Sequence, residues 1–293
     1  MSAEATSSVA LGALGPSVPA MSDADFLRLG ELIKSTLGIR MPLEKKTMIQ
    51  SRLLRRLKAL GLDTYRAYCD HLLMGAGATT ELTTFLDLVT TNKTSFFREP
   101  EHFRFLREQA LPELSARVGA RPLSVWSAPC STGEEPYTLA MVLAEHAEAT
   151  RTAAREFTVL GTDISTRVLE RASKGIFTEA QVEPVPMELR RKYLLRGKDA
   201  SAGLVRVAPE LRARVRFGRL NLMNARYPVD EPMDVILCRN VLIYFDKPTQ
   251  EAVVNKLCEH LAPGGFLCVG MAETLHGMRV PLKLVGKSVY RND

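Results

Sequence analysis

No stretch of the sequence is apolar over the roughly 20 residues that a helix needs to cross a bilayer, and no basic run precedes an apolar core near its start. The 5 cysteines form no Cys-x-x-Cys pair, have no histidines at metal-binding spacing and are odd in number. These absences argue against a membrane span, a structural metal and a disulfide framework. We therefore expect a cytoplasmic monomer with reduced thiols.

Two common phosphate-binding motifs are also missing. The segment from Ala128 to Gly133 has neither the glycines of Gly-x-Gly-x-x-Gly nor a P-loop lysine after it. It nevertheless joins an apolar, β-branched run to a predicted helix at 136–148, and such a corner binds nucleotide-like ligands in α/β sheets. A pyrophosphate-bearing cofactor is disfavoured. Glu134 and Glu135 at the start of the helix suit a cation better than a phosphate.

Alternating apolar runs and amphipathic stretches predict an α/β fold with a mostly parallel sheet. The expected strands are 123–128, 157–162, 215–220, 233–238 and 266–270, and the expected helices are 101–118, 136–148, 165–173 and 248–261. The alternation is interrupted at about 176–214, where a polar helical piece and a hairpin-like turn indicate a small inserted subdomain. We expect a turn at 262–265 and an edge strand at 282–290.

The residues before the α/β domain differ from it in composition and in the spacing of their apolar residues. Residues 1–20 contain mainly small residues and proline without a sustained period, and are predicted to be a disordered tail. From Ser22, apolar residues recur at helical spacing and predict an all-helical domain at 21–90. The segment 91–100 is predicted to be a linker that its two phenylalanines anchor in the next domain, so that it forms a lid over a site. Residues 101–293 are predicted to form the α/β domain.

Positive charge is concentrated in one predicted helix, at about 43–60. Between Arg40 and Lys58, seven basic residues stand against one acid, an excess equal to the formal net charge of +6 of the whole chain. The cationic arc opposite the apolar stripe consists of Lys45, Arg52, Arg55, Arg56 and Lys58. The like charges on a face with so few acids repel one another, which favours the binding of an acidic partner. The other interpretation is an ordinary solvated face.

The position of Asp163 suits contact with a bound nucleoside. Asp163 directly follows the second predicted strand, and from there it can accept hydrogen bonds from both hydroxyls of a ribose at the first corner. Taken alone, an acid at a strand end is also a common turn or helix cap. Combined with a corner that suits a cation, Asp163 favours a positively charged nucleoside, and S-adenosylmethionine is such a molecule.

Several motifs together resemble the CheR-type chemoreceptor glutamate methyltransferases. In the family's order over about 21–290, they are Asn92-Lys93-Thr94-Ser95-Phe96-Phe97-Arg98-Glu99, Trp126-Ser127-Ala128, Ser131-Thr132-Gly133-Glu134-Glu135-Pro136-Tyr137, Asp163-Ile164-Ser165, Asn221-Leu222 and Cys238-Arg239-Asn240-Val241-Leu242-Ile243-Tyr244-Phe245. The resemblance implies a class I S-adenosylmethionine-dependent methyltransferase domain of Rossmann-like fold, an all-helical N-terminal domain and an inserted antiparallel β-subdomain. The chain departs from the family at Met271 and Ala272, where a polar residue and a serine usually precede the glutamate.

The resemblance also implies a site. S-adenosylmethionine, with S-adenosylhomocysteine as its product, is implied to be bound by Asn92, Thr94, Arg98, Glu135, Asp163, Asn221, Leu222, Arg239 and Asn240. Arg98 and Tyr244 are implied to be catalytic, with Tyr244 beside the transferring methyl group. A core role for Tyr244, and a structural pairing of Arg239 with a nearby acid, stay open.

The implied partner is the cytoplasmic signalling domain of a chemoreceptor. Its acidic methylation region would dock on the basic helix, and a C-terminal tether peptide of the receptor would dock at the 197–203 turn of the inserted subdomain. A glutamate carboxylate has a pKa of about 4.3 and is ionised at pH 7, so its methylation needs no general base. Alignment must then supply most of the catalysis.

The sequence leaves two alternatives to this function. Nucleic-acid methylation is disfavoured, because 238–241 lacks the polar residue, two prolines and aromatic residue that hold a flipped base in amine-directed DNA enzymes, and no basic groove with interleaved aromatics is evident. A non-catalytic regulator that binds S-adenosylmethionine is the second alternative.

Overall fold

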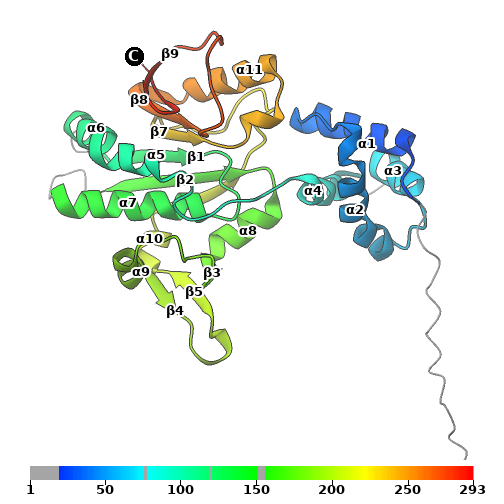
Figure 1. Cartoon of the computed structure of the whole chain (residues 1–293), viewed down its shortest axis with the longest axis horizontal. Coiled ribbons are helices and arrows are strands. Elements are labelled where there is room, and N and C mark those ends of the chain that lie inside the picture. Colours follow the sequence, from blue (N-terminus) through cyan, green and yellow to red (C-terminus); the bar gives the residue numbers. More distant parts are fainter. Residues whose placement is uncertain (1–19, 76–77, 119–120, 151–155, 293) are drawn as a thin grey trace, which may run out of the picture.

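The computed structural model describes residues 20–75, 78–118, 121–150 and 156–292. The predicted tail therefore lies outside the described residues, except for residue 20. In Figure 1 a helical domain stands beside an α/β domain, from which a small strand-containing subdomain projects. No helix within the described ranges is both long and apolar enough to cross a membrane.

The helical domain is built from four amphipathic helices. They are α1 (Asp23–Leu37), α2 (Lys46–Leu60), α3 (Tyr65–Met74) and α4 (Ala78–Val89). Ser22 caps α1 by accepting a hydrogen bond from the backbone N–H of Asp25, and Gly38, with φ of +70°, ends it. The buried faces of the four helices form one core, which includes Ile33, Leu53 and Phe85. The expected all-helical domain is confirmed.

The α/β domain contains a seven-stranded sheet in the order β6-β2-β1-β7-β8-β10-β9. Its strands are β1 (Leu123–Ser127), β2 (Phe157–Asp163), β6 (Val215–Arg219), β7 (Met233–Cys238), β8 (Leu261–Val269), β9 (Leu282–Gly286) and β10 (Val289–Asn292). The first five in the spatial order are parallel, and β10 and β9 form an antiparallel edge. The predicted class I methyltransferase architecture is confirmed.

Helices cover both faces of this sheet, so the central strands β1, β7 and β8 are buried on both sides almost throughout. Val125 of β1 packs in a core with α5 (Pro100–Phe105), α6 (Leu111–Val118) and α7 (Glu134–Thr150). The next residue, Trp126, packs in a second core with α11 (Lys247–Cys258). Figure 1 shows α7 and α11 on opposite sides of the sheet. The domain also contains a π-helical segment (Leu106–Ala110) and α8 (Thr166–Lys174).

Three predicted boundaries were wrong. Helix α7 begins at Glu134, because a proline is tolerated anywhere in the first turn, where backbone N–H groups have no partner within the helix. Strand β8 runs through the turn expected at 262–265, where the register with β7 shifts and Gly264 takes a φ of +66°. The segment expected to be one edge strand is the hairpin β9–β10.

The inserted subdomain is an antiparallel sheet with two short helices. Its elements are β3 (Ile176–Thr178), α9 (Met187–Tyr193), β4 (Leu194–Arg196), β5 (Leu204–Val207) and α10 (Pro209–Arg212), with strand order β3-β5-β4. Phe177 joins it to the rest of the molecule: its ring centroid lies 4.8 Å from that of Phe96 in the lid and 6.0 Å from that of Tyr137 in α7. The expected insertion is confirmed.

Candidate functional site

The corner after β1 and the acid after β2 meet at the carboxyl edge of the sheet. The backbone N–H of Ser131 donates to Asp163 Oδ2 at 2.9 Å, and that of Ser165 donates to Asp163 Oδ1 at 3.0 Å. Asp163 is only 4% exposed. Burial raises the pKa of its carboxyl group, although these backbone hydrogen bonds oppose the rise. The two features that the sequence separates by about 30 residues thus form one unit.

Gly133 allows this corner to close tightly. Its φ is +99°, and a Cβ atom there would lie 2.9 Å from the Cβ of Ala172 in α8. Ser131, with φ of +49°, is also in the left-handed region. The loop between β1 and α7 is therefore held against α8 and Asp163 in one conformation.

The lid, residues 91–100, is fixed at both ends. The Ser131 hydroxyl donates to the backbone oxygen of Asn92 at 3.1 Å, and the backbone N–H of Phe97 donates to the Thr138 hydroxyl at 3.2 Å. Phe96 is fully buried in the core of the α/β domain. The prediction that the paired phenylalanines anchor this segment is confirmed.

A cavity of about 260 Å³, called here the interdomain cavity, lies between the lid, the helical domain and the carboxyl ends of β1, β2 and β7. Six of the predicted cofactor-binding and catalytic residues line it: Asn92, Asp163, Asn221, Leu222, Asn240 and Tyr244. The helical domain contributes Leu37, Ile39, Met41, Lys45 and Met48. Sequence reasoning missed this apolar wall, because its residues follow the same helical spacing as any core. Within the described ranges, no group of three or more acidic, His or Cys residues could hold a metal ion.

Four predicted site residues do not line the cavity: Thr94, Arg98, Glu135 and Arg239. The Arg98 guanidinium donates to the backbone oxygen of Lys93 at 2.8 Å. Thr94 is partly buried in the lid. Their role in binding a ligand stays a prediction.

Arg239 is the centre of a buried ionic cluster beside the cavity. Its guanidinium donates to Glu135 Oε2 at 2.8 Å, to Glu99 Oε2 at 3.1 Å and to the backbone oxygen of Arg98. Only 2% of the Arg239 side chain is exposed. Burial raises the pKa of Glu135, whereas the charge of Arg239 lowers it. The structural pairing left open for Arg239 is therefore present, and it connects β7 with the lid.

The argument that both glutamates at the start of α7 face a cationic ligand was wrong for Glu134. Its side chain is buried, accepts a hydrogen bond from the Thr132 hydroxyl at 2.6 Å, and contacts the Gln181 amide at 3.3 Å. Adjacent helical residues point about 100° apart, so one of the pair faces the subdomain. Glu135 faces the cluster around Arg239.

The predicted basic helix at 43–60 is α2 preceded by a 3-10 turn at Leu43–Lys45, and its five cations are not all free. Arg56 binds the buried carboxylate of Glu81 at 2.5 Å, and Arg52 donates to three backbone oxygens at the end of α4. The expectation of an unpaired face was therefore wrong for these two arginines, because Glu81 is distant in sequence but adjacent in the folded domain. Arg55 and Lys58 are exposed. Lys45 lines the interdomain cavity, with Nζ 5.6 Å from the ring centroid of Tyr244.

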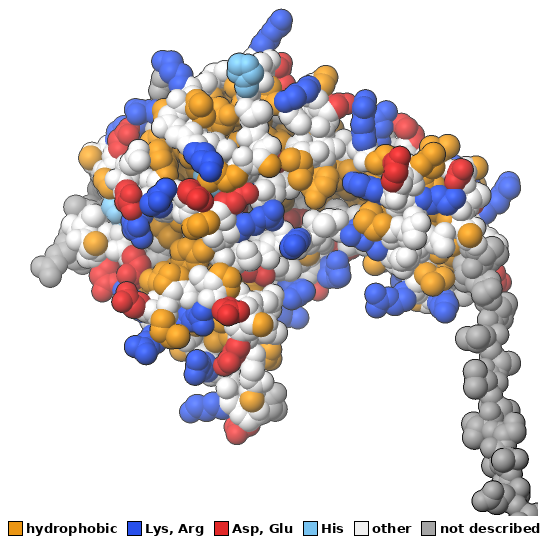
Figure 2. Space-filling model, viewed as in Figure 1, with side chains coloured by type: hydrophobic (Ala, Val, Ile, Leu, Met, Phe, Trp, Pro, Cys, Tyr) orange, Lys and Arg blue, Asp and Glu red, His pale blue; other side chains and the backbone are white. Residues whose placement is uncertain are grey.

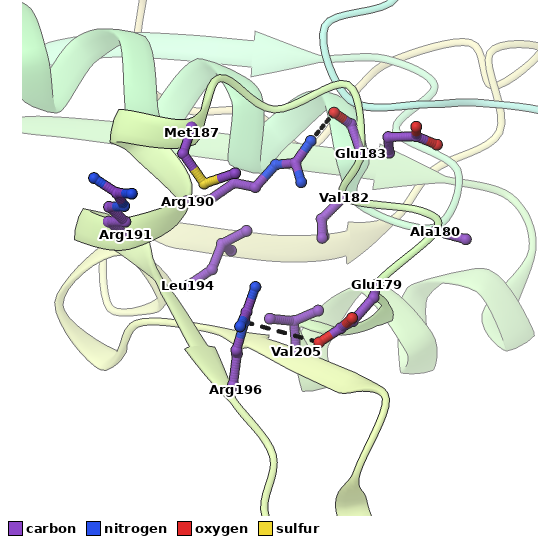
Figure 3. A pocket seen from close by; sticks show the side chains of 10 residues that line it. All are labelled: Glu179, Ala180, Val182, Glu183, Met187, Arg190, Arg191, Leu194, Arg196 and Val205. Carbon is purple, nitrogen blue, oxygen red and sulfur yellow. Dashed lines mark hydrogen bonds and ion pairs between the residues drawn. The ribbon is translucent and has the colours of Figure 1, made fainter.

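A second cavity, of about 590 Å³, lies in the inserted subdomain and is called here the subdomain cavity. Figure 3 shows its mixed lining: Met187, Leu194 and Val205 supply apolar surface, while charged side chains from α9, β4 and the loop after β3 surround it. The Arg196 and Glu179 side chains approach to 3.8 Å. The sequence predicted a peptide site nearby, at the 197–203 turn, but none of the residues that line this cavity belongs to that turn.

Comparison with known proteins gives a consistent result. Residues 24–90 match the family described as CheR methyltransferase, all-alpha domain, and residues 92–291 match CheR methyltransferase, SAM binding domain. The chain is 40% identical over 271 residues to a chemotaxis protein methyltransferase of Salmonella typhimurium, covering 92% of this chain and 91% of that protein. It is 39% identical to the protein of that name from Escherichia coli, again covering 92% of this chain and 91% of the relative.

Proposed function

This chain belongs to the CheR methyltransferase family, and from that premise we propose that it transfers the methyl group of S-adenosylmethionine to glutamate carboxylates of chemoreceptor signalling domains, forming methyl esters. The observation that carries the proposal is the interdomain cavity, which brings Asp163, Asn240 and Tyr244 from three separate motifs together with the lid residue Asn92.

The residues of the cavity suit S-adenosylmethionine. Its largely apolar walls fit an adenine ring, and the Asp163 carboxylate is placed to accept from ribose hydroxyls. The side-chain amides of Asn92, Asn221 and Asn240 offer both donors and acceptors for the remaining polar groups. Bound there, the cofactor supplies an electrophilic methyl group on a positively charged sulfur.

The protein's own part in the reaction is alignment. A glutamate acceptor is already ionised at pH 7, so the chain needs no base to activate it. Tyr244 borders the cavity and is assigned to orient the methyl donor and the acceptor carboxylate, together with Arg98 once the receptor is bound. Holding the two reactants in line accounts for up to about 7 to 11 kcal/mol of barrier reduction.

The acceptor approaches over the basic helix. Lys45, Arg55 and Lys58 remain as docking cations, since Arg52 and Arg56 have partners inside the domain. Figure 2 shows Lys and Arg side chains of the helical domain on the side that borders the concave part of the molecule. Lys45 lies nearest the site of transfer, beside Tyr244. An acidic methylation helix is complementary to this surface.

The subdomain cavity is assigned to the receptor's C-terminal tether peptide. It combines apolar surface from Met187, Leu194 and Val205 with charged side chains, as binding a short amphipathic peptide requires (Figure 3). The chain works as a cytoplasmic monomer in this proposal, and the tether only raises the local concentration of receptor.

One assay tests the proposal. The protein is incubated with methyl-labelled S-adenosylmethionine and receptor cytoplasmic fragments, and the label released by mild base is counted. We expect base-labile label on receptor glutamates, and clearly less label with Asp163→Ala at a cofactor concentration near the Kd of the unmodified chain. Label on nucleic acid would support a nucleic-acid methyltransferase, and cofactor binding without transfer would support a regulator; either result would reject the proposal.

A further inference from the structure

The turn that carries Asn240 and Tyr244 begins with a left-handed residue. The chain leaves β7 and turns at Asn240, whose φ is +57°, before a short 3-10 helix at Leu242–Tyr244. Asparagine tolerates this conformation better than most residues other than glycine, and contacts with its surroundings hold it in place. Two carboxylates outside the predicted site residues supply the fixing contacts.

The carboxylate of Glu273 holds the turn from one side. Its Oε2 atom accepts from the backbone N–H of Asn240 at 2.9 Å and of Gly270 at 2.6 Å, and its Oε1 atom accepts from that of Ile243 at 3.2 Å. Glu273 is buried. A single side chain thus ties the end of β8 to both ends of the turn.

The carboxylate of Glu99 holds the same turn from the side of the lid. Its Oε1 atom accepts from the Asn240 amide at 3.0 Å, while its Oε2 atom accepts from Arg239 at 3.1 Å and from the backbone N–H of Met271 at 3.2 Å. Burial alone would raise the pKa of Glu99, but these hydrogen bonds and the charge of Arg239 keep it below its usual value. Because Glu99 belongs to the lid, these contacts hold the lid against the turn.

Gly270 makes the space that this arrangement needs. A Cβ atom at this position would lie 2.6 Å from the side-chain amide nitrogen of Asn240 and 2.7 Å from Glu273 Oε2. Met271, where the chain departs from its family's usual residues, contributes only its backbone N–H to the contact with Glu99. The departure therefore leaves the contact intact.

We propose that Glu99 and Glu273 are positioning residues, which hold Asn240 and Tyr244 at the wall of the interdomain cavity and in register with the lid. The inference rests on the proposed function, in which Tyr244 aligns the reactants. When catalysis depends on alignment, a displacement of about 1 Å can lower the rate about 100-fold. Glu99 and Glu273 can therefore control the rate through Asn240 without touching the ligand.

The sharpest variant is Glu273→Gln, which keeps the size of the side chain but turns an NH2 group toward backbone donors. We expect kcat for receptor methylation to fall about 10- to 100-fold, because a misplacement of about 1 Å costs up to about 100-fold. Calorimetry with S-adenosylhomocysteine should still show one site per chain, with affinity reduced less than about tenfold. Glu99→Gln should have the same pattern.

A matched control is Asp234→Asn, at the opposite end of β7. Asp234 is fully buried, accepts from Arg121 at 2.8 Å and from the backbone N–H of Ser124 at 3.0 Å, and lies outside both cavities. We expect Asp234→Asn to lower the denaturation midpoint at least as much as Glu273→Gln does. Its kcat, calculated per molecule that binds S-adenosylhomocysteine, should equal that of the unmodified chain. An equal loss of kcat per competent molecule in both variants would overturn the proposal.

Amide hydrogen exchange separates the proposal from the proposed function, because it needs no methyl acceptor. In Glu273→Gln, peptides covering 239–244 should exchange faster than in the unmodified chain, while β7 stays protected. If exchange in this turn is unchanged, or if exchange rises equally throughout the chain, the positioning role is rejected. If the chain proves unable to methylate receptors but the local exchange and affinity changes occur, the proposed function fails and the positioning of the turn stands.

Discussion

The interdomain cavity and the subdomain cavity differ in how their polar groups are held. In the interdomain cavity the Asp163 carboxylate accepts from two backbone N–H groups, and the Asn240 amide is bound by Glu99. In the subdomain cavity, charged side chains such as Arg191 and Glu183 border a space more than twice as large. Fixed polar groups in a small space suit one rigid ligand, whereas a wide cavity with charged borders suits a peptide. Changes at the first should therefore have the larger effects.

The largest effect is expected from Asp163→Ala, which removes the carboxylate but leaves the subdomain cavity intact. Cofactor affinity measured by calorimetry should fall at least about tenfold, because a buried charged hydrogen-bond acceptor contributes about 1.5 to 3 kcal/mol. The control is Asp199→Ala, in the turn of the inserted subdomain, which should retain its affinity. If Asp163→Ala binds S-adenosylhomocysteine as tightly as the unmodified chain, Asp163 is not part of the site.

A smaller effect is expected from Tyr244→Phe, which removes a single hydroxyl group at the cavity wall. We expect kcat to fall about tenfold with cofactor affinity nearly unchanged, the pattern of a group that acts mainly in the transition state. Tyr65→Phe is a suitable control, since its hydroxyl donates to the backbone oxygen of Gln50 at 2.9 Å within the helical domain, outside both cavities. An unchanged kcat in Tyr244→Phe would leave this tyrosine with a packing role only.

The sequence predicts a site residue when the interactions that place it lie within a few positions along the chain. The corner and Asp163 were predictable, because each follows a strand whose pattern is visible in a few residues. The pairing of Arg56 with Glu81 was not, since it depends on how two helices pack across 25 positions. Nor could the sequence reveal that Glu99 and Glu273 share Asn240, because three segments must meet before that contact exists.

The free part of the basic helix allows a sharper test of receptor docking. Changing Lys45, Arg55 and Lys58 together to Gln should lower kcat/KM for a receptor fragment about tenfold at low salt, with little change at high salt, because exposed charges act mainly on association. The assay uses saturating cofactor, because Lys45 also lines the interdomain cavity. Equal kcat/KM for the triple variant and the unmodified chain at low salt would identify the face as merely solvated.

Arg56→Gln provides the contrast within the same helix. It leaves the buried Glu81 carboxylate without its ionic partner, so it should lower the free energy of unfolding by about 1 to 3 kcal/mol. The pKa of Glu81 is lowered in the folded chain by this partner and by Tyr68, although burial opposes the shift. The stabilisation is therefore present above the unfolded pKa and lost as the pH falls through the folded one. Denaturation of both chains at several pH values should show their difference shrinking in acid.

The smallest effect is expected at the subdomain cavity. Met187 borders it and is 52% exposed, so Met187→Glu should fold normally while placing a charge on the apolar part of the peptide site. Methylation of a receptor that carries its C-terminal tether should fall a few-fold, because tethering changes only local concentration, and a receptor without the tether should be unaffected. Leu284→Glu, 65% exposed on β9 and outside both cavities, is the matched control. If both variants lower methylation of the tethered receptor equally, the cavity does not bind the tether, and its wide, charged lining reflects the surface of a structural insertion.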